Sequence, residues 1–470
     1  MTNTSQTPEQ ILTSLCEIDS LNKIYEEKFK YNTTKGIDRI NGSQFEKQAQ
    51  SQIQVIHDKC LSGTYKFSPY LELLKSKGRG KPPRVIAIPT VRDRIVLYIL
   101  KELLFKVFPE CVHRQLANTY IVEIIKVLNN KKPSEVAIFR TDIKNFYGSI
   151  NREKLICKLE ERIPSIKIIK LIQRAIETPA VPQNYRKKDK GKYIEGKGVP
   201  QGLSISNILA SIYLAELDQE MKEMKEMKEM DSSGYDYFRY VDDIIVFTDN
   251  SQVNNAENLL KEKINSLDLK LNEDKTDTAT GDKRFEYLGY RFELPKVTVR
   301  IATVERFIHS VAAKFSRYIY TRQRKINKYN NDIDKLKNIF MMDLNEKITG
   351  AISEKRRYGW VFYFIAVNDI SVFYKLDKII ASFFNRLDDF DKVPPPNLKK
   401  LSRTFYEAKH TPEGGYIHNY NSYENVKQKT EFLSQRGELD PNSEEDINDI
   451  FERVKRRNLS ELEKDDAHLS

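Results

Sequence analysis

The chain has 470 residues, of which 40% are hydrophobic, and it carries a net charge of +11. This length is too great for one ordinary domain and predicts two to four. The sequence contains no apolar run of about 18 residues and no basic-then-apolar leader, which argues against a membrane protein and predicts a cytoplasmic one.

The charge is unevenly distributed along the chain. Residues 431–470 hold 12 acidic and 6 Lys or Arg side chains, a net charge of −6, so residues 1–430 carry +17. Such a basic body predicts a polyanionic partner bound in a salt-dependent way, although a basic protein without one is the alternative. The four cysteines, Cys16, Cys60, Cys111 and Cys157, show no CxxC spacing, which argues against a zinc site and requires no disulfide.

The first half of the chain alternates predicted helices and strands. Residues 1–33 have the polar pattern of a helical extension, and Val91 to Phe108 has apolar residues at helical spacing. Ala137 to Ile143 predicts a strand that ends at Asp142, followed by a turn into a capped helix that begins near Asn151. A carboxylate in this position is either a metal ligand or a helix cap.

Two segments with distinctive patterns precede the apolar run that begins at Phe238. Gly198 to Gly202 contains two glycines, which permit a close backbone approach, and it leads into the helix-like run from Ser206 to Leu214. Met221 to Met230 repeats every three residues and predicts an extended helix with methionines on one face, with a partner contact as the alternative.

Two adjacent acids, Asp242 and Asp243, interrupt the apolar run from Phe238 to Phe247. The β-forming residues on both sides predict a hairpin whose turn or bulge carries these acids. Two carboxylates beside a core strand are unfavourable unless a cation neutralises them, and oxygen ligands suit Mg²⁺. With Asp142 they predict a two-metal site for phosphoryl transfer, with a solvated hairpin tip as the alternative.

The last third of the chain reads as helical. Residues 300–390 interleave arginines such as Arg322 and Arg324 with tyrosines, which suits either nucleic-acid binding or a solvated helix face. Tyr358 to Phe364 holds the single tryptophan, which we expect to pack in the core. Pro394 to Pro396 marks a stiff break, and the acidic end predicts a loose tail with a short helix around Ile447 to Val454.

These segments, in this order, resemble the conserved blocks of reverse transcriptases, in particular those of the retron and group II intron-like superfamily. Phe238 to Phe247 is similar to the YxDD block, and Arg140 to Asn151 is similar to the first aspartate block. The other similar segments are Lys35–Asp38, Gly63–Pro69, Pro83–Arg94, Gly198–Ser204, Leu271–Thr276 and Phe285–Tyr290. The resemblance spans roughly residues 34–292.

The resemblance implies an α+β fold of the right-hand polymerase type, with an RRM-like sheet and helices in the fingers and palm. The expected parts are an N-terminal helical extension (1–33), fingers (34–135), palm (136–299), helical thumb (300–393) and a C-terminal extension with an acidic tail (394–470).

The resemblance also implies roles for single residues. Asp142, Asp242 and Asp243 would be catalytic and, with the carbonyl of Ile143, would bind two Mg²⁺ ions, for which Mn²⁺ is a substitute. Tyr147 would lie beneath the incoming sugar and exclude a 2′-hydroxyl, with simple packing as the alternative. The remaining implied residues are Arg84 (or Lys81), Gln201 and Lys275 for the nucleotide, and Pro200, Gly202, Tyr240, Leu288, Gly289, Arg322 and Arg324 for nucleic acid.

The implied function is RNA-directed DNA synthesis, with an RNA template, dNTPs and a DNA product. The chain has no Cys/His cluster after the thumb and no NAxxH segment, and Val297-Thr298-Val299 stands nearest to the VTG turn of retron enzymes. This profile is most like bacterial defence-associated (antiphage, abortive-infection-type) reverse transcriptases that copy a dedicated noncoding RNA. The alternatives are template-independent or protein-primed synthesis by the same site, and an RNA-binding maturase-like protein with a vestigial site. A partner protein or a homo-oligomer stays open.

Overall fold

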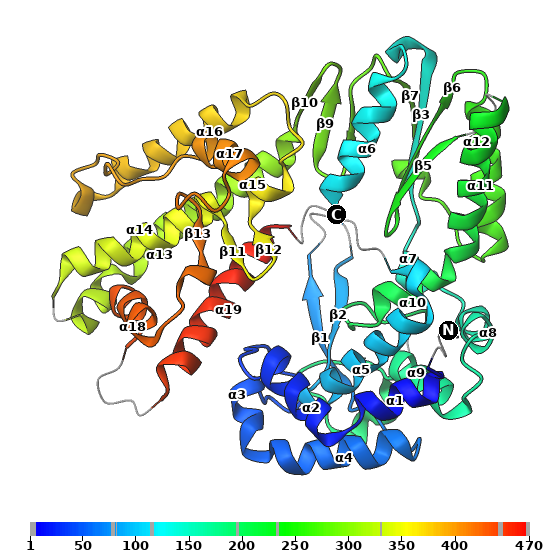
Figure 1. The fold of residues 1–470 in the computed structure, drawn as a ribbon, viewed down its shortest axis with the longest axis horizontal. Helices are drawn as coiled ribbons and strands as arrows, with labels where there is room; N and C mark the ends of the chain where they lie inside the picture. Colours follow the sequence, from blue (N-terminus) through cyan, green and yellow to red (C-terminus); the bar gives the residue numbers. More distant parts are fainter. Residues whose placement is uncertain are drawn as a thin grey trace, which may run out of the picture. The chain divides into compact units, whose positions relative to one another are not determined.

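The computed structural model describes residues 6–76, 80, 82–112, 117–193, 197–231, 235–329, 331–439 and 445–466. The chain divides into two compact units: unit 1 comprises residues 1–114 and 137–278, and unit 2 comprises residues 115–136 and 279–470. Both contain helices and β-sheets (Figure 1), which confirms the α+β class. In the described part of the chain, no helix is long and apolar enough to span a membrane.

The helices of unit 1 begin where the sequence supplies polar caps. The side chains of Thr90 and Asn151 accept hydrogen bonds from backbone N–H groups three residues further on. The helices predicted from Val91 and near Asn151 are therefore confirmed. The helices of unit 1 are α1 (Pro8–Leu15), α2 (Ile18–Ile24), α3 (Gly42–Phe45), α4 (Ala49–Leu61), α5 (Val91–Val107), α7 (Phe146–Ser149), α8 (Arg152–Glu160), α9 (Ile166–Glu177), α10 (Ser206–Tyr213), α11 (Ala215–Asp231) and α12 (Val253–Ser266).

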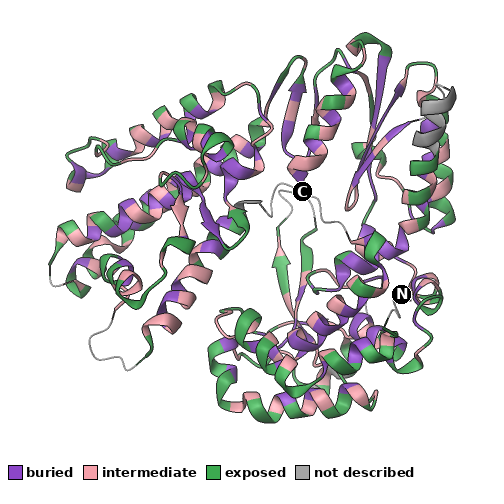
Figure 2. Cartoon of the chain, in the orientation of Figure 1, coloured by how far each residue is buried: buried purple, intermediate pink, exposed green. Residues whose placement is uncertain are grey.

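A four-stranded sheet forms the centre of unit 1, with the strand order β5-β6-β3-β7. Its strands are β3 (Val136–Asp142), β5 (Asp236–Tyr240), β6 (Asp243–Asp249) and β7 (Asp277–Thr280). β3 and β6 are buried over most of their length (Figure 2), as expected for strands covered on both faces. α11 contacts β5 and α12 contacts β6. The predicted strand that ends at Asp142 and the predicted acidic hairpin are both confirmed.

A second sheet of unit 1 has the order β2-β1-β4. Its strands are β1 (Tyr70–Lys75), β2 (Arg84–Ile88) and β4 (Ala180–Val181). β1 and β2 are antiparallel, with Leu73 opposite Ile86 and Lys75 opposite Arg84. Arg84 therefore stands at the first position of β2, where its side chain is exposed.

Unit 2 combines helices with two small sheets, of order β10-β9-β8 and β12-β11-β13. Its helices are α6 (Ala117–Asn129), α13 (Ile301–Lys328), α14 (Ile333–Thr349), α15 (Trp360–Tyr363), α16 (Ser371–Ser382), α17 (Leu401–His410), α18 (Val426–Gln435) and α19 (Ile447–Asp466). Its strands are β8 (Phe285–Tyr287), β9 (Tyr290–Glu293), β10 (Lys296–Val299), β11 (Ala351–Ser353), β12 (Arg356–Tyr358) and β13 (His418–Asn419). The predicted limits of the fingers, palm, thumb and C-terminal extension stay predictions.

Trp360 lies in an aromatic core of unit 2. It is buried, its ring stacks on Phe307 with 4.5 Å between ring centroids, and it also contacts Phe364 at 4.8 Å. Aromatic pairs at these separations add to the stabilisation from burial alone. The packing role predicted for the tryptophan is confirmed.

The acidic end of the chain is more ordered than the sequence predicts. The expected loose tail with a short helix is wrong, because α19 runs from Ile447 to Asp466 and buries Phe451, Val454 and Leu462. These residues join a hydrophobic cluster with Phe432 of α18. Acidic residues outnumber basic ones by 12 to 6 in residues 431–470, but the apolar residues of α19 recur at helical spacing and form one buried face.

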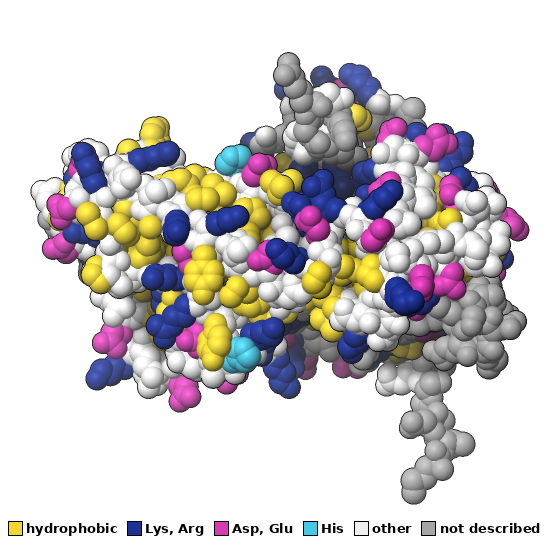
Figure 3. All heavy atoms as spheres, turned by 90° about the horizontal axis from the view of Figure 1, so that it is seen from above, with side chains coloured by type: hydrophobic (Ala, Val, Ile, Leu, Met, Phe, Trp, Pro, Cys, Tyr) yellow, Lys and Arg dark blue, Asp and Glu magenta, His cyan; other side chains and the backbone are white. Residues whose placement is uncertain are grey.

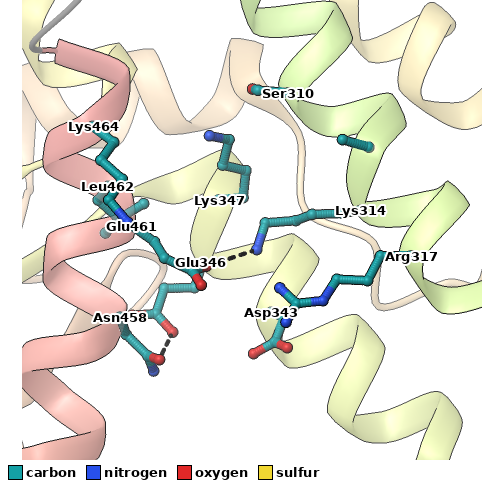
Figure 4. A pocket seen from close by; sticks show the side chains of 11 residues that line it. Ser310, Lys314, Arg317, Asp343, Glu346, Lys347, Asn458, Glu461, Leu462 and Lys464 are labelled. Carbon is teal, nitrogen blue, oxygen red and sulfur yellow. Dashed lines mark hydrogen bonds and ion pairs between the residues drawn. The ribbon is translucent and has the colours of Figure 1, made fainter. Parts of the chain in front are cut away.

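A pocket of about 320 Å³ lies beside α19, where this helix faces α13 and α14 (Figure 4). Its lining is mostly charged, and Lys314 of α13 pairs with Glu461 of α19 at 3.4 Å. Asn458 of α19 donates a 3.4 Å hydrogen bond to Glu346 of α14. Polar contacts therefore join α19 to both helices in addition to its apolar face.

The repeat of methionines lies within α11, so the predicted helical extension is confirmed for its backbone. Met221 at its start is buried. The side chains of residues 224–230 lie outside the described residues, and so does any shared methionine face.

Candidate active site

Backbone hydrogen bonds bring the two acidic segments of unit 1 together. The N–H of Ile143, directly after β3, donates a 3.1 Å hydrogen bond to the carbonyl of Asp242 in the hairpin. On the other side, the N–H of Asn272 donates to the carbonyl of Asp142 at 2.9 Å, and Ile143 forms a β-bridge with Leu271. The three sequence blocks that carry Asp142, Asp242 and Lys275 therefore meet at the end of β3.

The hairpin turn has an unusual backbone. Tyr240 pairs with Asp243, so Val241 and Asp242 alone form the turn. Val241 has a φ of +58°, a left-handed conformation that a β-branched side chain disfavours. Strained residues of this kind persist only where the surrounding structure holds them, which is common at functional sites. The strain lies directly beside Asp242, the first of the two predicted catalytic acids in the hairpin.

The carboxylates and Lys275 form a charged group. Lys275 Nζ donates to Oδ2 of Asp142, which is only 5% exposed. Partial burial lowers the pKa of Lys275, but the hydrogen bond to Asp142 and the charges of the three aspartates raise it, and the net change is upward. Burial raises the pKa of the Asp242 carboxyl, and the charge of Asp142 raises it further. Asp142 thus disfavours the charged form of Asp242, and the nearby cations of Lys275 and Arg84 offset part of this effect.

One observation bears on whether this group can hold a metal. The second oxygen of Asp142, Oδ1, is buried and has no hydrogen-bond partner among the described residues. A buried carboxylate oxygen without a partner is unfavourable unless a cation supplies the missing contact. Aspartate oxygens are also the donor type that Mg²⁺ and Mn²⁺ prefer, so the chemistry of these side chains suits a divalent ion.

The arrangement of the described side chains falls short of a complete set of metal ligands. Among the described residues, no group of three or more His, Cys, Asp or Glu side chains lies close enough together to hold a metal ion. The ammonium of Lys275 instead binds Asp142. The metal-binding roles of Asp142, Ile143, Asp242 and Asp243 therefore stay predictions.

The glycine block lies against the helix that carries Tyr147. Gly198 has a φ of +67°, and a Cβ atom there would lie 2.1 Å from the carbonyl oxygen of Tyr147, so only glycine fits. The N–H of Val199 donates to the same carbonyl at 2.8 Å. The Tyr147 hydroxyl donates to Oδ1 of Asn207 on α10, which fixes the ring orientation.

The same block also lies against β2. The N–H of Ala87 donates a 2.7 Å hydrogen bond to the carbonyl of Gln201, and Gly202 would clash with Ile86 if it had a Cβ atom, at 2.7 Å. Ser206 donates to the carbonyl of Pro200 at 2.6 Å, at the start of α10. The predicted contacts Pro200, Gln201 and Gly202 therefore form a rigid link between β2 and α10.

The pKa of Tyr147 is shifted by burial and by the charges of Asp242 and Arg84. Burial raises its pKa to about 12, the charge of Asp242 adds to the rise, and the charge of Arg84 opposes it. Unit 1 contains the three aspartates and seven of the other residues with predicted roles. These are Arg84, Tyr147, Gln201 and Lys275 for the nucleotide, Pro200 and Gly202 on the template side, and Tyr240 of the hairpin. Lys81, the alternative to Arg84, lies outside the described residues.

The other predicted nucleic-acid contacts lie in unit 2. Leu288 and Gly289 form the turn between β8 and β9, both with positive φ, and the Leu288 carbonyl accepts a 3.0 Å hydrogen bond from the Tyr363 hydroxyl. Arg322 binds both oxygens of Asp389 at 2.6 Å, so its guanidinium has a structural partner, whereas Arg324 is exposed. On the face in Figure 3, Lys and Arg side chains are interspersed with hydrophobic and acidic ones.

Sequence reasoning missed Arg239, which lies in strand β5 of the hairpin, and Asp218, which lies in α11. Arg239 is a buried arginine inside the apolar run that leads to Asp242, and its guanidinium binds the carboxylate of Asp218 on α11. A charged residue at the centre of an apolar strand was the available signal, because such a residue requires a buried partner.

Comparison with known proteins gives one family and several relatives. Residues 75–292 match the reverse transcriptase (RNA-dependent DNA polymerase) family. The chain is 23% identical over 297 residues to protein YkfC of Escherichia coli, covering 55% of this chain and 75% of YkfC. It is 28% identical over 194 residues to the group II intron-encoded protein LtrA of Lactococcus lactis subsp. cremoris, covering 40% of this chain and 30% of LtrA.

Among solved structures, apo telomerase from Candida tropicalis matches with a TM-score of 0.41 and 13% identity, covering 89% of this chain and 76% of that chain. The family match contains all three aspartates, the glycine block and Lys275. By this family match, residues 75–292 form a reverse transcriptase domain, that is, an RNA-directed DNA polymerase domain of the nucleotidyltransferase class.

Proposed function

We propose that Asp142, Asp242 and Asp243 form the catalytic centre of this polymerase and hold two Mg²⁺ ions, for which Mn²⁺ can substitute. The observation that carries the proposal is the 3.1 Å hydrogen bond from Ile143 to Asp242, which joins two acid-bearing segments a hundred residues apart. The partnerless, buried Oδ1 of Asp142 supports it, because a divalent ion would supply the missing contact.

The chain's own residues would bind and orient the reactants. Bound divalent ions supply charge neutralisation at the primer 3′-hydroxyl and at the departing pyrophosphate. Arg84, exposed on β2, offers the rigid fork of donors that suits a triphosphate. Lys275 is protonated beside Asp142 and can exchange this carboxylate for a phosphate oxygen. Positioning and charge suffice for phosphoryl transfer, so no covalent protein nucleophile is required.

Template and primer contacts extend the proposal. Pro200, Gln201 and Gly202 present a rigid backbone to the template side of the nascent pair, and Tyr240 lies at the end of β5 next to the acids. In unit 2, the Leu288–Gly289 turn would contact the primer, and exposed Arg324 is better suited to a phosphate than Arg322, whose guanidinium binds Asp389.

Primer extension on an RNA template tests the activity. With dNTPs and Mg²⁺, the purified chain should extend a DNA primer to the end of the RNA, and a chelator should stop extension until excess Mg²⁺ is added. Pretreatment of the template with ribonuclease should also abolish the product. Product of unchanged length and sequence without RNA would instead establish template-independent synthesis.

Tyr147 should control the choice between deoxyribose and ribose. A smaller side chain in Tyr147→Val would open space for a 2′-hydroxyl, so the preference for dNTP over rNTP should fall by about 10-fold or more, an effect of about 1.4 kcal/mol or more in transition-state binding. Single-nucleotide incorporation with each nucleotide measures the ratio. Asn207→Ala is the matched variant: it removes the hydrogen bond to the Tyr147 hydroxyl but keeps the ring that blocks the 2′-hydroxyl, so it should change the ratio much less. An unchanged ratio in Tyr147→Val would remove Tyr147 from the sugar site.

The biological setting is a further part of the proposal: a dedicated noncoding RNA as template, in bacterial antiphage defence. It rests on the resemblance of the sequence to bacterial defence-associated reverse transcriptases. Sequencing the nucleic acid that copurifies with the chain should reveal one predominant RNA and its DNA copy. Phage plaque counts on cells with the active and the metal-site variant chains should differ; equal counts would argue against a defence role.

A further inference from the structure

Arg239 makes three hydrogen bonds that together hold the turn formed by Val241 and Asp242. Its Nε donates to Oδ1 of Asp218 at 2.7 Å, its Nη2 donates to Oδ2 of the same carboxylate, and its Nη1 donates to the carbonyl of Val241 at 2.8 Å. The side chain of Arg239 is only 2% exposed. A two-point contact between a guanidinium and a carboxylate fixes the plane of both groups, so the third donor has a defined direction.

That third donor acts on the peptide group between Val241 and Asp242. The carbonyl of Val241 belongs to the peptide that precedes Asp242, and the carbonyl of Asp242 belongs to the peptide that follows it. Arg239 binds the first, and the N–H of Ile143 binds the second at 3.1 Å. Both peptide planes that flank Asp242 are therefore held by partners outside the turn, and together they set the direction of its Cα–Cβ bond.

The turn needs such support because Val241 has a φ of +58°. Valine disfavours this conformation, so a free turn would relax toward negative φ and rotate the peptide before Asp242. Asp218 is itself held in place: the Tyr237 hydroxyl donates to its Oδ1 at 3.0 Å. The support thus runs from α11 through Asp218 and Arg239 to the turn.

We propose that Arg239 and Asp218 are positioning residues that hold the strained Val241–Asp242 turn, so that the Asp242 carboxylate faces Asp142. The proposal rests on the catalytic role proposed for Asp242. Neither residue touches the reactants; both act through the backbone of the turn.

The test compares Arg239→Lys and Asp218→Asn with the unchanged chain. Arg239→Lys keeps the positive charge but loses the two-point contact of the guanidinium. Asp218→Asn keeps the size of the side chain but removes its negative charge. Each variant should lower kcat of primer extension by about 30-fold, because a shifted ligand loses transition-state contacts, while KM for dNTP changes by less than about threefold. Arg174→Lys is the matched control, because Arg174 also donates to backbone carbonyls in unit 1, those of Gly63 and Tyr65, and should keep the unchanged kcat.

A double-mutant cycle separates this role from simple packing. Glycine adopts positive φ without strain, so in the Val241→Gly background the loss caused by Arg239→Lys should shrink to less than about fivefold. Unchanged kcat in Arg239→Lys and Asp218→Asn, or equal losses from Arg239→Lys with and without the Val241→Gly change, would overturn the proposal. If Arg239→Lys does not fold, as judged by its melting curve, Asp218→Asn decides alone. Absence of polymerase activity in the unchanged chain would instead count against the proposed function.

Discussion

Replacing Asp242 and Asp243 together by asparagine should abolish DNA synthesis, with a loss of about 10³-fold or more in kcat. The double change removes two of the three negative charges that would neutralise divalent ions, yet it retains the shape of the side chains. The hairpin itself depends on backbone pairs such as Tyr240 with Asp243, which asparagine preserves. Incorporation of labelled dNTP on an RNA template measures the effect.

A matched change at the other end of the same strand serves as the control. Asp249 is the last residue of β6, and Asp249→Asn should extend the primer at the unchanged rate. Gel-shift measurements should show that the double variant still binds RNA, since its fold is retained and its net positive charge is not reduced. Full polymerisation by the double variant would refute the assignment of the catalytic centre.

Arg436→Met should destabilise unit 2 by about 3–5 kcal/mol, because the change leaves the buried carboxylate of Glu346 without its cation. Arg436 is 4% exposed and Glu346 is 6% exposed; the guanidinium binds Glu346 and, at 2.7 Å, Asp343 of α14. The Tyr420 hydroxyl donates to the other oxygen of Glu346 at 2.6 Å. Urea unfolding followed by tryptophan fluorescence measures the loss, since Trp360 lies in the same unit.

Two further variants locate the origin of this loss. Lys337→Met removes a partly exposed ion pair with Asp334 in α14 and should change the free energy of unfolding by less than about 1 kcal/mol. Arg436→Met combined with Glu346→Leu removes both buried charges and should recover most of the stability. Equal effects of Arg436→Met and Lys337→Met would show that the buried cluster contributes little.

The local parts of the site were predictable because short-range patterns specify them. The apolar run before Asp142 predicts a buried strand, and the β-forming residues around Asp242 and Asp243 predict the hairpin; both exist as expected. The sequence also predicted a short helix around Ile447 to Val454, but the acidic composition of this end led to the wrong expectation of a loose tail, whereas α19 extends to Asp466.

Contacts between distant residues were not predictable from one sequence. Nothing near Arg322 in the chain indicates that the carboxylate of Asp389, 67 residues later, binds its guanidinium. The same holds for Lys275, whose ammonium binds Asp142 across 133 residues, and for Arg239 with Asp218. Such pairs depend on the tertiary fold, whereas hairpins and helices depend mainly on neighbouring residues.

The division of the chain has a consequence for how it folds. Unit 2 takes residues 115–136, including α6, from the middle of unit 1, and α6 buries Ala117, Ile121, Ile124 and Leu128. Neither unit is continuous, so each must close a long loop before its native contacts form, and a high contact order slows folding. A fragment that starts at residue 279 would lack α6 and leave apolar surface open. We therefore expect the chain to refold slowly and to pass through partly assembled species in which this surface is exposed to aggregation.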